Sequence, residues 1–179
     1  AGGEALTRQG RFEAARAGKA ILAEGGDAIE AMLAMAAAIA IVYPHMNSIG
    51  GDAFWLVREP NGRVRYIEAC GFAGRKATIE SYRQDGHSYI PRRGPRAALT
   101  VPGAVGGWAI ARGLSRSLGG KLPLDALLHA GIRLAREGYA QSKSEARYGH
   151  REKEDLFAAP GFAATFLVDG KVPEAGAPR

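Results

Sequence analysis

Cys70 is the only cysteine of the chain and the first residue to consider as a nucleophile. A cysteine attacks carbonyl carbons as a thiolate, which requires an activating base nearby. His45 follows a long apolar segment that the fold could bring close to the thiol. The alternative is a purely structural role, in which the cysteine packs as a small hydrophobic residue. These two residues therefore define one open hypothesis, an autonomous Cys70–His45 hydrolase.

Metal and phosphate sites find little support in the residue spacing. The four histidines are far apart and no two have the spacing of helical metal ligands: His45, His87, His129 and His150. There is no carboxylate-rich calcium loop. The glycine-rich residues 101–107 lack both G-x-G-x-x-G and a Gly-Lys-Ser/Thr ending. We therefore expect no metal and no cofactor, and interpret residues 101–107 as a tight strand-to-helix turn.

Composition restricts the class of protein further. The 179 residues suit one domain, and 46% hydrophobic with 23% charged residues exclude bulk disorder. The net charge of +6 is scattered apart from a basic loop at residues 91–96, and no aromatic residues interleave with it. This pattern argues against nucleic-acid binding. The longest uncharged apolar run, residues 31–43, is shorter than the roughly 20 residues of a membrane span, so we expect no membrane insertion.

Two helices are predicted at the start of the chain. Residues 11–24 are rich in small and apolar residues, and Gly25-Gly26 ends the pattern as a C-terminal glycine does. Asp27, with Glu30 three residues later, predicts a capping box. The helix that follows, residues 28–42, is almost entirely apolar, so we expect it to be buried on most of its faces.

A β-hairpin is predicted next. Residues 53–58 and 63–69 read as strands on either side of Pro60-Asn61-Gly62, a strong turn signal. Two strands make a poor sheet by themselves. We therefore expect the hairpin to pair with residues 98–101 and 165–168, or with strands of another chain.

The rest of the chain is mostly helical. The pattern predicts helices over residues 79–84, 104–118, 124–137 and 142–157, then a flexible, Pro/Gly/Ala-rich tail over 173–179. No linker divides the sequence, so residues 1–179 are interpreted as one domain segment. The order of elements predicts an α+β architecture, in which helices pack against an antiparallel sheet.

Four segments resemble the gamma-glutamyltranspeptidase family of N-terminal nucleophile hydrolases. Residues 25–31 are similar to its G-G-N-A-V/I-D-A, and residues 43–54 to its E-P-x-x-x-G-I-G-G-x-x-F. Residues 100–108 are similar to V-P-G-x-x-x-G-W, and residues 130–142 to A-I-x-L-A-x-x-G-F/Y-x-V/L-S. The four segments occur in the family's order and cover most of the chain.

The resemblance implies a four-layer αββα sandwich that is completed by a second, small chain. Such enzymes are zymogens that cut themselves into a heterodimer, and the new N-terminal Thr of the small chain is the nucleophile. All four segments resemble the large chain, and nothing here matches the T-T-H-F/L cleavage segment. The resemblance thus implies no catalytic residue in this chain. It implies γ-glutamyl transfer or amide hydrolysis, including glutathione metabolism, with a small amide or γ-glutamyl substrate.

One departure from the family concerns substrate binding. The family carries an Arg in a D-x-R-E-x-A-P block, and that Arg holds the α-carboxylate of the γ-glutamyl group; here Cys70 stands at its place. A thiol cannot pair with a carboxylate as a guanidinium does, although Arg75 could substitute. By resemblance, the substrate-pocket wall comprises Asn47, Ser48, Cys70, Gly71 and Phe72.

Two further readings stay open at this stage. The missing Arg and cleavage segment also suit a catalytically inactive binding or scaffold member of the same fold. A cephalosporin-acylase-like amidase, not specific for γ-glutamyl groups, suits the same sequence pattern. The compartment stays unknown: the lack of a leader-like pattern at the start favours the cytoplasm slightly over the periplasm.

Overall fold

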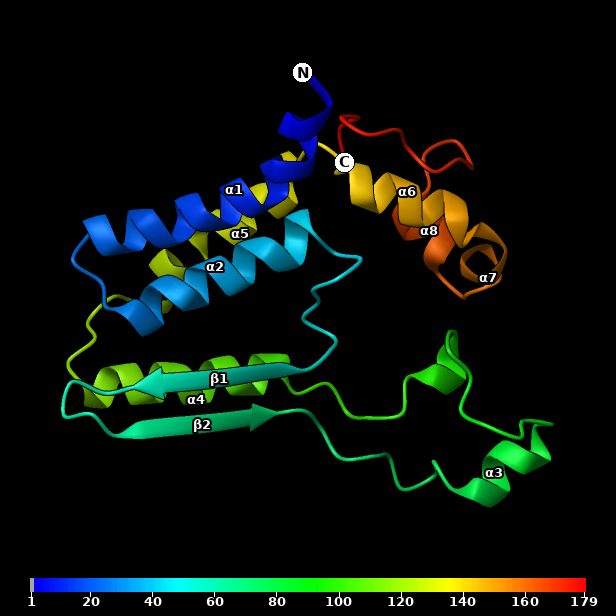
Figure 1. Cartoon of the computed structure of the whole chain (residues 1–179), viewed down its shortest axis with the longest axis horizontal. Coiled ribbons are helices and arrows are strands. Elements are labelled where there is room, and N and C mark those ends of the chain that lie inside the picture. Colours follow the sequence, from blue (N-terminus) through cyan, green and yellow to red (C-terminus); the bar gives the residue numbers. More distant parts are fainter. Residues whose placement is uncertain (1) are drawn as a thin grey trace.

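The structure, a computed structural model, describes the backbone of residues 2–179 and the side chains from Phe12 onward. The arrangement of the helices and the β-hairpin is α+β. Helices α1, α2 and α5 pack against one another, and α4 lies against the hairpin (Figure 1). The helices are α1 Gly2–Ala23, α2 Ala28–Val42, α3 Ile79–Gln84, α4 Ala104–Ser117, α5 Leu124–Glu137, α6 Lys143–Arg151, α7 Lys153–Phe157 and α8 Phe162–Phe166. The strands are β1 Ala53–Arg58 and β2 Val64–Ala69.

The start of α2 is fixed by its own residues, as the sequence predicts. The backbone N–H of Glu30 donates to Asp27 Oδ1 at 2.8 Å, and Asp27 N donates to Glu30 Oε2 at 3.0 Å. The same two carboxylates also accept bonds from distant segments. Ser115 Oγ donates to Asp27 Oδ2 at 2.7 Å, and Leu122 N donates to Glu30 Oε1 at 2.8 Å. The predicted capping box is thus confirmed, and it also ties α2 to the α4–α5 connection.

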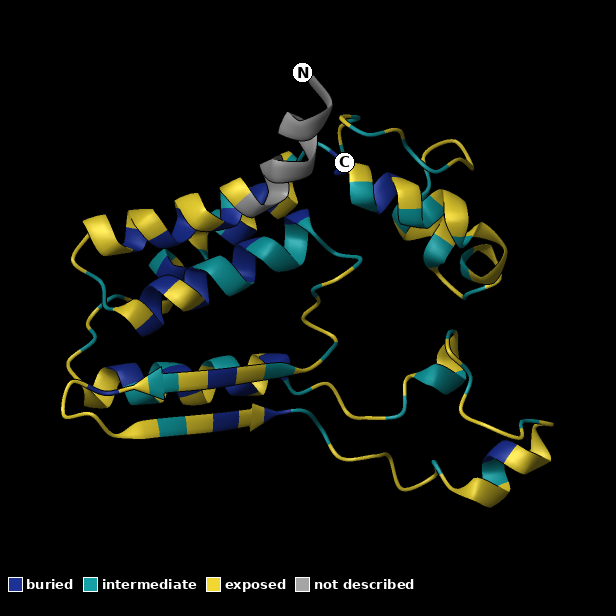
Figure 2. Ribbon diagram, viewed as in Figure 1, coloured by how far each residue is buried: buried dark blue, intermediate teal, exposed yellow. Residues whose placement is uncertain are grey.

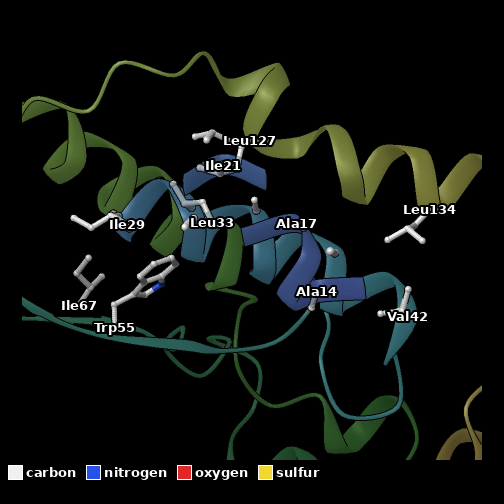
Figure 3. Packing of buried hydrophobic residues seen from close by; sticks show 14 residues of the cluster. Ala14, Ala17, Ile21, Ile29, Leu33, Val42, Trp55, Ile67, Leu127 and Leu134 are labelled. Atoms are coloured by element: carbon white, nitrogen blue, oxygen red, sulfur yellow. The ribbon is translucent and has the colours of Figure 1, made fainter. Parts of the chain in front are cut away.

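The central helix α2 is buried between its neighbours α1, α5 and α4. Buried apolar side chains from these helices and from the hairpin form one cluster, which includes Ile21, Leu33, Trp55 and Leu127 (Figure 3). The alanines of α2 leave room for this close stacking, because helices with small side chains approach each other closely. Among the described residues, no helix combines the length and apolar character needed to cross a membrane.

The hairpin has one buried and one exposed face. Trp55 pairs with Ile67 and both point into the core, whereas Phe54, Leu56 and Tyr66 lie on the opposite face. The alternation of dark blue and yellow along the strands shows this pattern (Figure 2). Leu56 is 77% exposed, and the Phe54 and Tyr66 rings stack with centroids 6.5 Å apart. The outer face is therefore a largely apolar surface, with Arg58 and Glu68 beside the apolar side chains, and no described residue covers it.

Neither predicted extra strand joins this sheet, which has two strands in the described part of the chain. Residues 98–101 run beside the segment after β2 and make one isolated bridge, Ala73 to Thr100. Residues 162–166 form α8 instead of leading into a strand, because alanine favours helix and aromatics four residues apart share a helix face. The rings of Phe162 and Phe166 stack there at 5.1 Å. The alternative that another chain completes the sheet stays a prediction.

The C-terminal part differs from the sequence expectation in two further ways. The predicted helix over 142–157 is broken at Glu152, which lies between α6 and α7. The predicted flexible tail, residues 173–179, is held by backbone hydrogen bonds: Gln141 N donates to Ala177 O, and Arg179 N to Tyr139 O. The expectation missed these bonds because their partners lie more than 30 residues away in the sequence.

Candidate functional site

Three segments meet at the end of the hairpin where β1 begins and β2 ends: residues 47–52, 70–72 and 101–104 (Figure 1). Gly51 O accepts hydrogen bonds from the first backbone N–H groups of α4, including Gly103 N at 3.1 Å. The loop after α2 is therefore joined to the start of α4. This arrangement brings the segments that carry the five predicted pocket residues to the same end of the hairpin, although only Asn47 and Ser48 of the five line the cavity found there.

Two glycines allow the backbones to meet at this edge. Val101 N donates to Phe72 O at 3.0 Å, so the two segments run side by side. A Cβ atom on Gly71 would overlap the carbonyl oxygen of Val101, and one on Gly103 would overlap that of Ala69. Only glycine permits this close approach, so both glycines are required for the shape of the site.

A cavity of about 370 Å³ opens beside these segments. Polar groups of Asn47, Ser48 and Asp52 line it, together with His45, Trp108 and small apolar residues of α2. Ser48 Oγ accepts a hydrogen bond from Gly50 N at 2.9 Å, which holds the glycine-rich turn. An apolar cavity with a few converging polar groups is the usual form of a small-molecule site.

Cys70 lies at this edge as a thiol rather than as an activated thiolate. Its Sγ donates a hydrogen bond to Glu68 Oε1 at 3.3 Å. This bond raises the pKa of the Cys70 thiol above its ordinary value, and partial desolvation and the charges of Glu68 and Asp52 raise it further. A nucleophilic cysteine needs the opposite environment.

His45 does not serve Cys70 as a base. Its Nε2 lies 3.1 Å from Ser144 Oγ, and its ring packs between Tyr43 and Tyr148 with centroids 4.2 and 5.7 Å away. Burial lowers the pKa of His45, so the ring is neutral at pH 7. The structure gives no support to a Cys70–His45 hydrolase, because the thiol and the imidazole are hydrogen-bonded to different partners.

The other predicted residues occupy different positions at the same edge. Phe72 is 93% exposed and projects from the segment after β2. Arg75, considered as a substitute for the missing Arg, is exposed on the segment that leads to α3. The described residues contain no group of three or more His, Cys, Asp or Glu side chains placed to hold a metal ion.

Sequence reasoning missed one further feature, a cavity of about 440 Å³ between α6–α8 and the chain end. Its lining includes Pro44, Gln141, Glu145 and Phe166, residues that only the tertiary fold brings together. No motif in the sequence indicates this cavity.

The thiol environment makes a testable prediction. We expect iodoacetamide to alkylate Cys70 slowly at pH 7 and progressively faster above the ordinary thiol pKa, because the raised pKa keeps the unreactive thiol form. Glu68→Gln replaces the charged acceptor with a neutral amide, which can also donate to the thiolate, and should move the pH profile of alkylation to lower pH. Mass spectrometry measures the rate, and Glu80→Gln, an exposed change on α3, is the control. An unchanged profile in Glu68→Gln would contradict the assignment.

The chain is similar in sequence to several known proteins. The family model described as Gamma-glutamyltranspeptidase matches residues 14–178. Oxamate amidohydrolase proenzyme of Klebsiella pneumoniae is 49% identical over 164 residues, which cover 91% of this chain and 31% of that protein. The chain spans about a third of the length of the curated relatives that it matches.

Solved structures of similar proteins share the fold of this chain. The gamma-glutamyltranspeptidase of Helicobacter pylori superimposes with a TM-score of 0.81 at 27% identity, over 93% of this chain and 47% of that one. The cephalosporin acylase of Bacillus halodurans gives a TM-score of 0.79 at 34% identity, over 92% of this chain and 31% of that one. The α+β arrangement described above is thus the one found in these proteins.

Proposed function

Because the chain belongs to the gamma-glutamyltranspeptidase family, we propose that it is the large-chain segment of an amide hydrolase or acyl transferase. The Thr nucleophile lies on a small chain cut from the same precursor. The observation that carries the proposal is the convergence of segments 47–52, 70–72 and 101–104 beside the cavity, since two of them contain family-like motifs. The relatives' designation as proenzymes supports a cleaved precursor.

The exposed outer face of the hairpin is evidence for the proposed partner chain. Phe54, Leu56 and Tyr66 present an apolar surface on a sheet of only two strands. Such a sheet gains stability when further strands or a second layer cover it. We propose that the small chain provides that cover, so that the nucleophile is placed next to the edge where β2 ends.

The chemistry follows that of an N-terminal nucleophile. The Thr amine takes the proton of its own hydroxyl, and the Oγ attacks the substrate amide carbonyl. The tetrahedral intermediate expels the amine, which leaves with the proton, and an ester-linked acyl-enzyme remains. Water or an acceptor amine then attacks the ester and restores the hydroxyl. In this scheme Asn47, Ser48, Cys70, Gly71 and Phe72 form the substrate wall and take no covalent part.

The residues of the proposed pocket wall indicate which class of substrate the site accepts. At Cys70 the site has a neutral, hydrogen-bonded thiol, which offers no charge to an α-carboxylate. We propose a small amide as the acyl donor, without dependence on the carboxylate of a γ-glutamyl group. The names of the relatives support this breadth, since one is an oxamate amidohydrolase and another a cephalosporin acylase.

Intact mass measurement under denaturing conditions, with N-terminal sequencing of every polypeptide, tests the proposal. We expect a second polypeptide that begins with Thr and that gains the acyl mass when the protein is quenched during turnover of an amide such as oxamate. Thr→Ala at that position should abolish hydrolysis, whereas Cys70→Ala, a change in the proposed substrate wall, should alter KM without abolishing turnover. A protein with no Thr-starting chain and no turnover would instead support the inactive scaffold. Acyl mass on Cys70 would also overturn the proposal.

A further inference from the structure

The loop between α2 and β1, residues 43–52, carries Asn47 and Ser48, which line the cavity of about 370 Å³ (Figure 1). The middle of this loop has little support of its own. Residues 48–50 are exposed, and in the described part of the chain none of them makes a hydrogen bond to a residue outside the loop. The positions of Asn47 and Ser48 therefore depend on how the two ends of the loop are held.

Backbone atoms hold the loop at both ends, but they join only one end to a neighbouring element. Near β1, Gly51 O accepts from Gly103 N at 3.1 Å, which joins the loop to the start of α4. Near α2, the backbone N–H groups of Met46 and Asn47 donate to Tyr43 O at 3.2 and 3.0 Å. This turn fixes the loop to the end of α2, and a contact to a second element has to come from a side chain.

His45 supplies that contact. Its Nε2 lies 3.1 Å from the Oγ of Ser144, a residue of α6 that is 99 positions later in the chain. Ser144 stands on a well-held turn, because its Oγ also lies 3.2 Å from Ser142 Oγ. Ser142 is 1% exposed and is the N-cap of α6, where it accepts from Glu145 N. The imidazole of His45 therefore connects the loop to the capped first turn of α6.

We propose that His45 is a positioning residue for substrate binding, whose hydrogen bond to Ser144 holds Asn47 and Ser48 in the cavity wall. This inference rests on the proposed function, amide hydrolysis or acyl transfer. His45 lines the cavity itself and Ser144 does not, so any effect of Ser144 on the substrate passes through His45. Contacts with a pocket wall act on the bound substrate and on the transition state alike. Loss of the bond should therefore raise KM and leave kcat almost unchanged.

Steady-state kinetics of the intact protein, with every polypeptide it carries, tests the proposal with oxamate as the amide. His45→Phe keeps a ring beside Tyr43 and Tyr148 and removes the hydrogen bond. Ser144→Ala removes the same bond from the other side and leaves the Ser142 cap in place. We expect each substitution to raise KM about five- to tenfold, the effect of one lost hydrogen bond, with kcat changed less than about twofold.

Further variants separate the bond from general damage to the fold. The double variant, with both His45→Phe and Ser144→Ala, should be no worse than either single variant, because both remove one shared interaction. His45→Gln carries an amide that can also bond Ser144 Oγ, so it should keep KM within about twofold of the unsubstituted protein. His129→Phe is the matched control, since His129 is exposed on α5. Additive losses in the double variant, or a loss in His45→Gln equal to that in His45→Phe, would overturn the assignment.

Hydrogen exchange, measured by mass spectrometry on the same proteins, distinguishes failure of this inference from failure of the proposed function. In both single variants the amides of Met46 and Asn47 should exchange at least about fivefold faster, whereas those of α5 should not change. Unchanged exchange at Met46 and Asn47 would overturn the inference whether or not oxamate is hydrolysed. Faster exchange with an unchanged KM would also overturn it, because the bond would then be purely structural. Absence of turnover in the unsubstituted protein would count against the proposed function, and exchange would still test the anchoring of the loop.

Discussion

Gly71→Ala is expected to destabilise the protein by about 3 kcal/mol or more and to abolish amide hydrolysis. The new Cβ would overlap the carbonyl oxygen of Val101 and lie 2.6 Å from its carbonyl carbon. Both are backbone atoms, so no side-chain rotation relieves the overlap. The segment after β2 would have to separate from residues 101–104, and the edge that carries the proposed pocket wall would open.

Urea denaturation of the intact protein measures the loss, and Gly74→Ala is its matched control. Gly74 belongs to the same connection between β2 and α3, but a Cβ there meets no atom within 4 Å. We therefore expect Gly74→Ala to change the free energy of unfolding by less than about 0.5 kcal/mol and to retain activity. If Gly71→Ala were as stable and as active as Gly74→Ala, the close contact with Val101 would not be essential.

Leu127→Ala is expected to cost about 2–5 kcal/mol, because it leaves a cavity in the centre of the core. Leu127 is fully buried within the cluster that joins α5 to α2 (Figure 3). The loop at residues 44–52 continues directly from the end of α2, so loosening α2 should also reduce hydrolysis. Thermal unfolding of the intact protein measures the change.

Leu124→Ala, on the same helix, is the matched control. Leu124 is 46% exposed at the start of α5, so its truncation removes little buried surface and creates no enclosed cavity. We expect its effect to stay below about 1 kcal/mol. Equal losses from the two substitutions would contradict the central role of Leu127 in the core, because helix propensity by itself favours Ala over Leu.

The elements that sequence reasoning predicted correctly are those that depend on nearby residues. The capping box of Asp27 and Glu30 spans three residues, and the hairpin follows from alternating side chains around Pro60-Asn61-Gly62. Residues 79–84 form a helix whose N-cap, Thr78, accepts from Ser81 N. The family motifs were also recognisable from the sequence, because each consists of residues that are close together in the chain.

What failed depends on contacts between distant residues. Residues 98–101 do not join the hairpin, because they pack against the segment after β2. The C-terminal tail is held in place by its backbone hydrogen bonds to Tyr139 and Gln141. The pairing of His45 with Ser144 is also long-range, whereas the bond of Cys70 to Glu68 spans only two residues.

The amino-acid sequence alone thus determined the family, the α+β class and the positions of most helices and both strands. The tertiary structure decided which side chains share a site, because folding alone brings residues such as Gly51, Gly71 and Gly103 to one edge. It also decided which buried polar atoms have no partner among the described residues, as at Gln141 and Glu145. The physical reason is that hydrogen bonding and burial are properties of the space around an atom, which neighbours distant in the chain define.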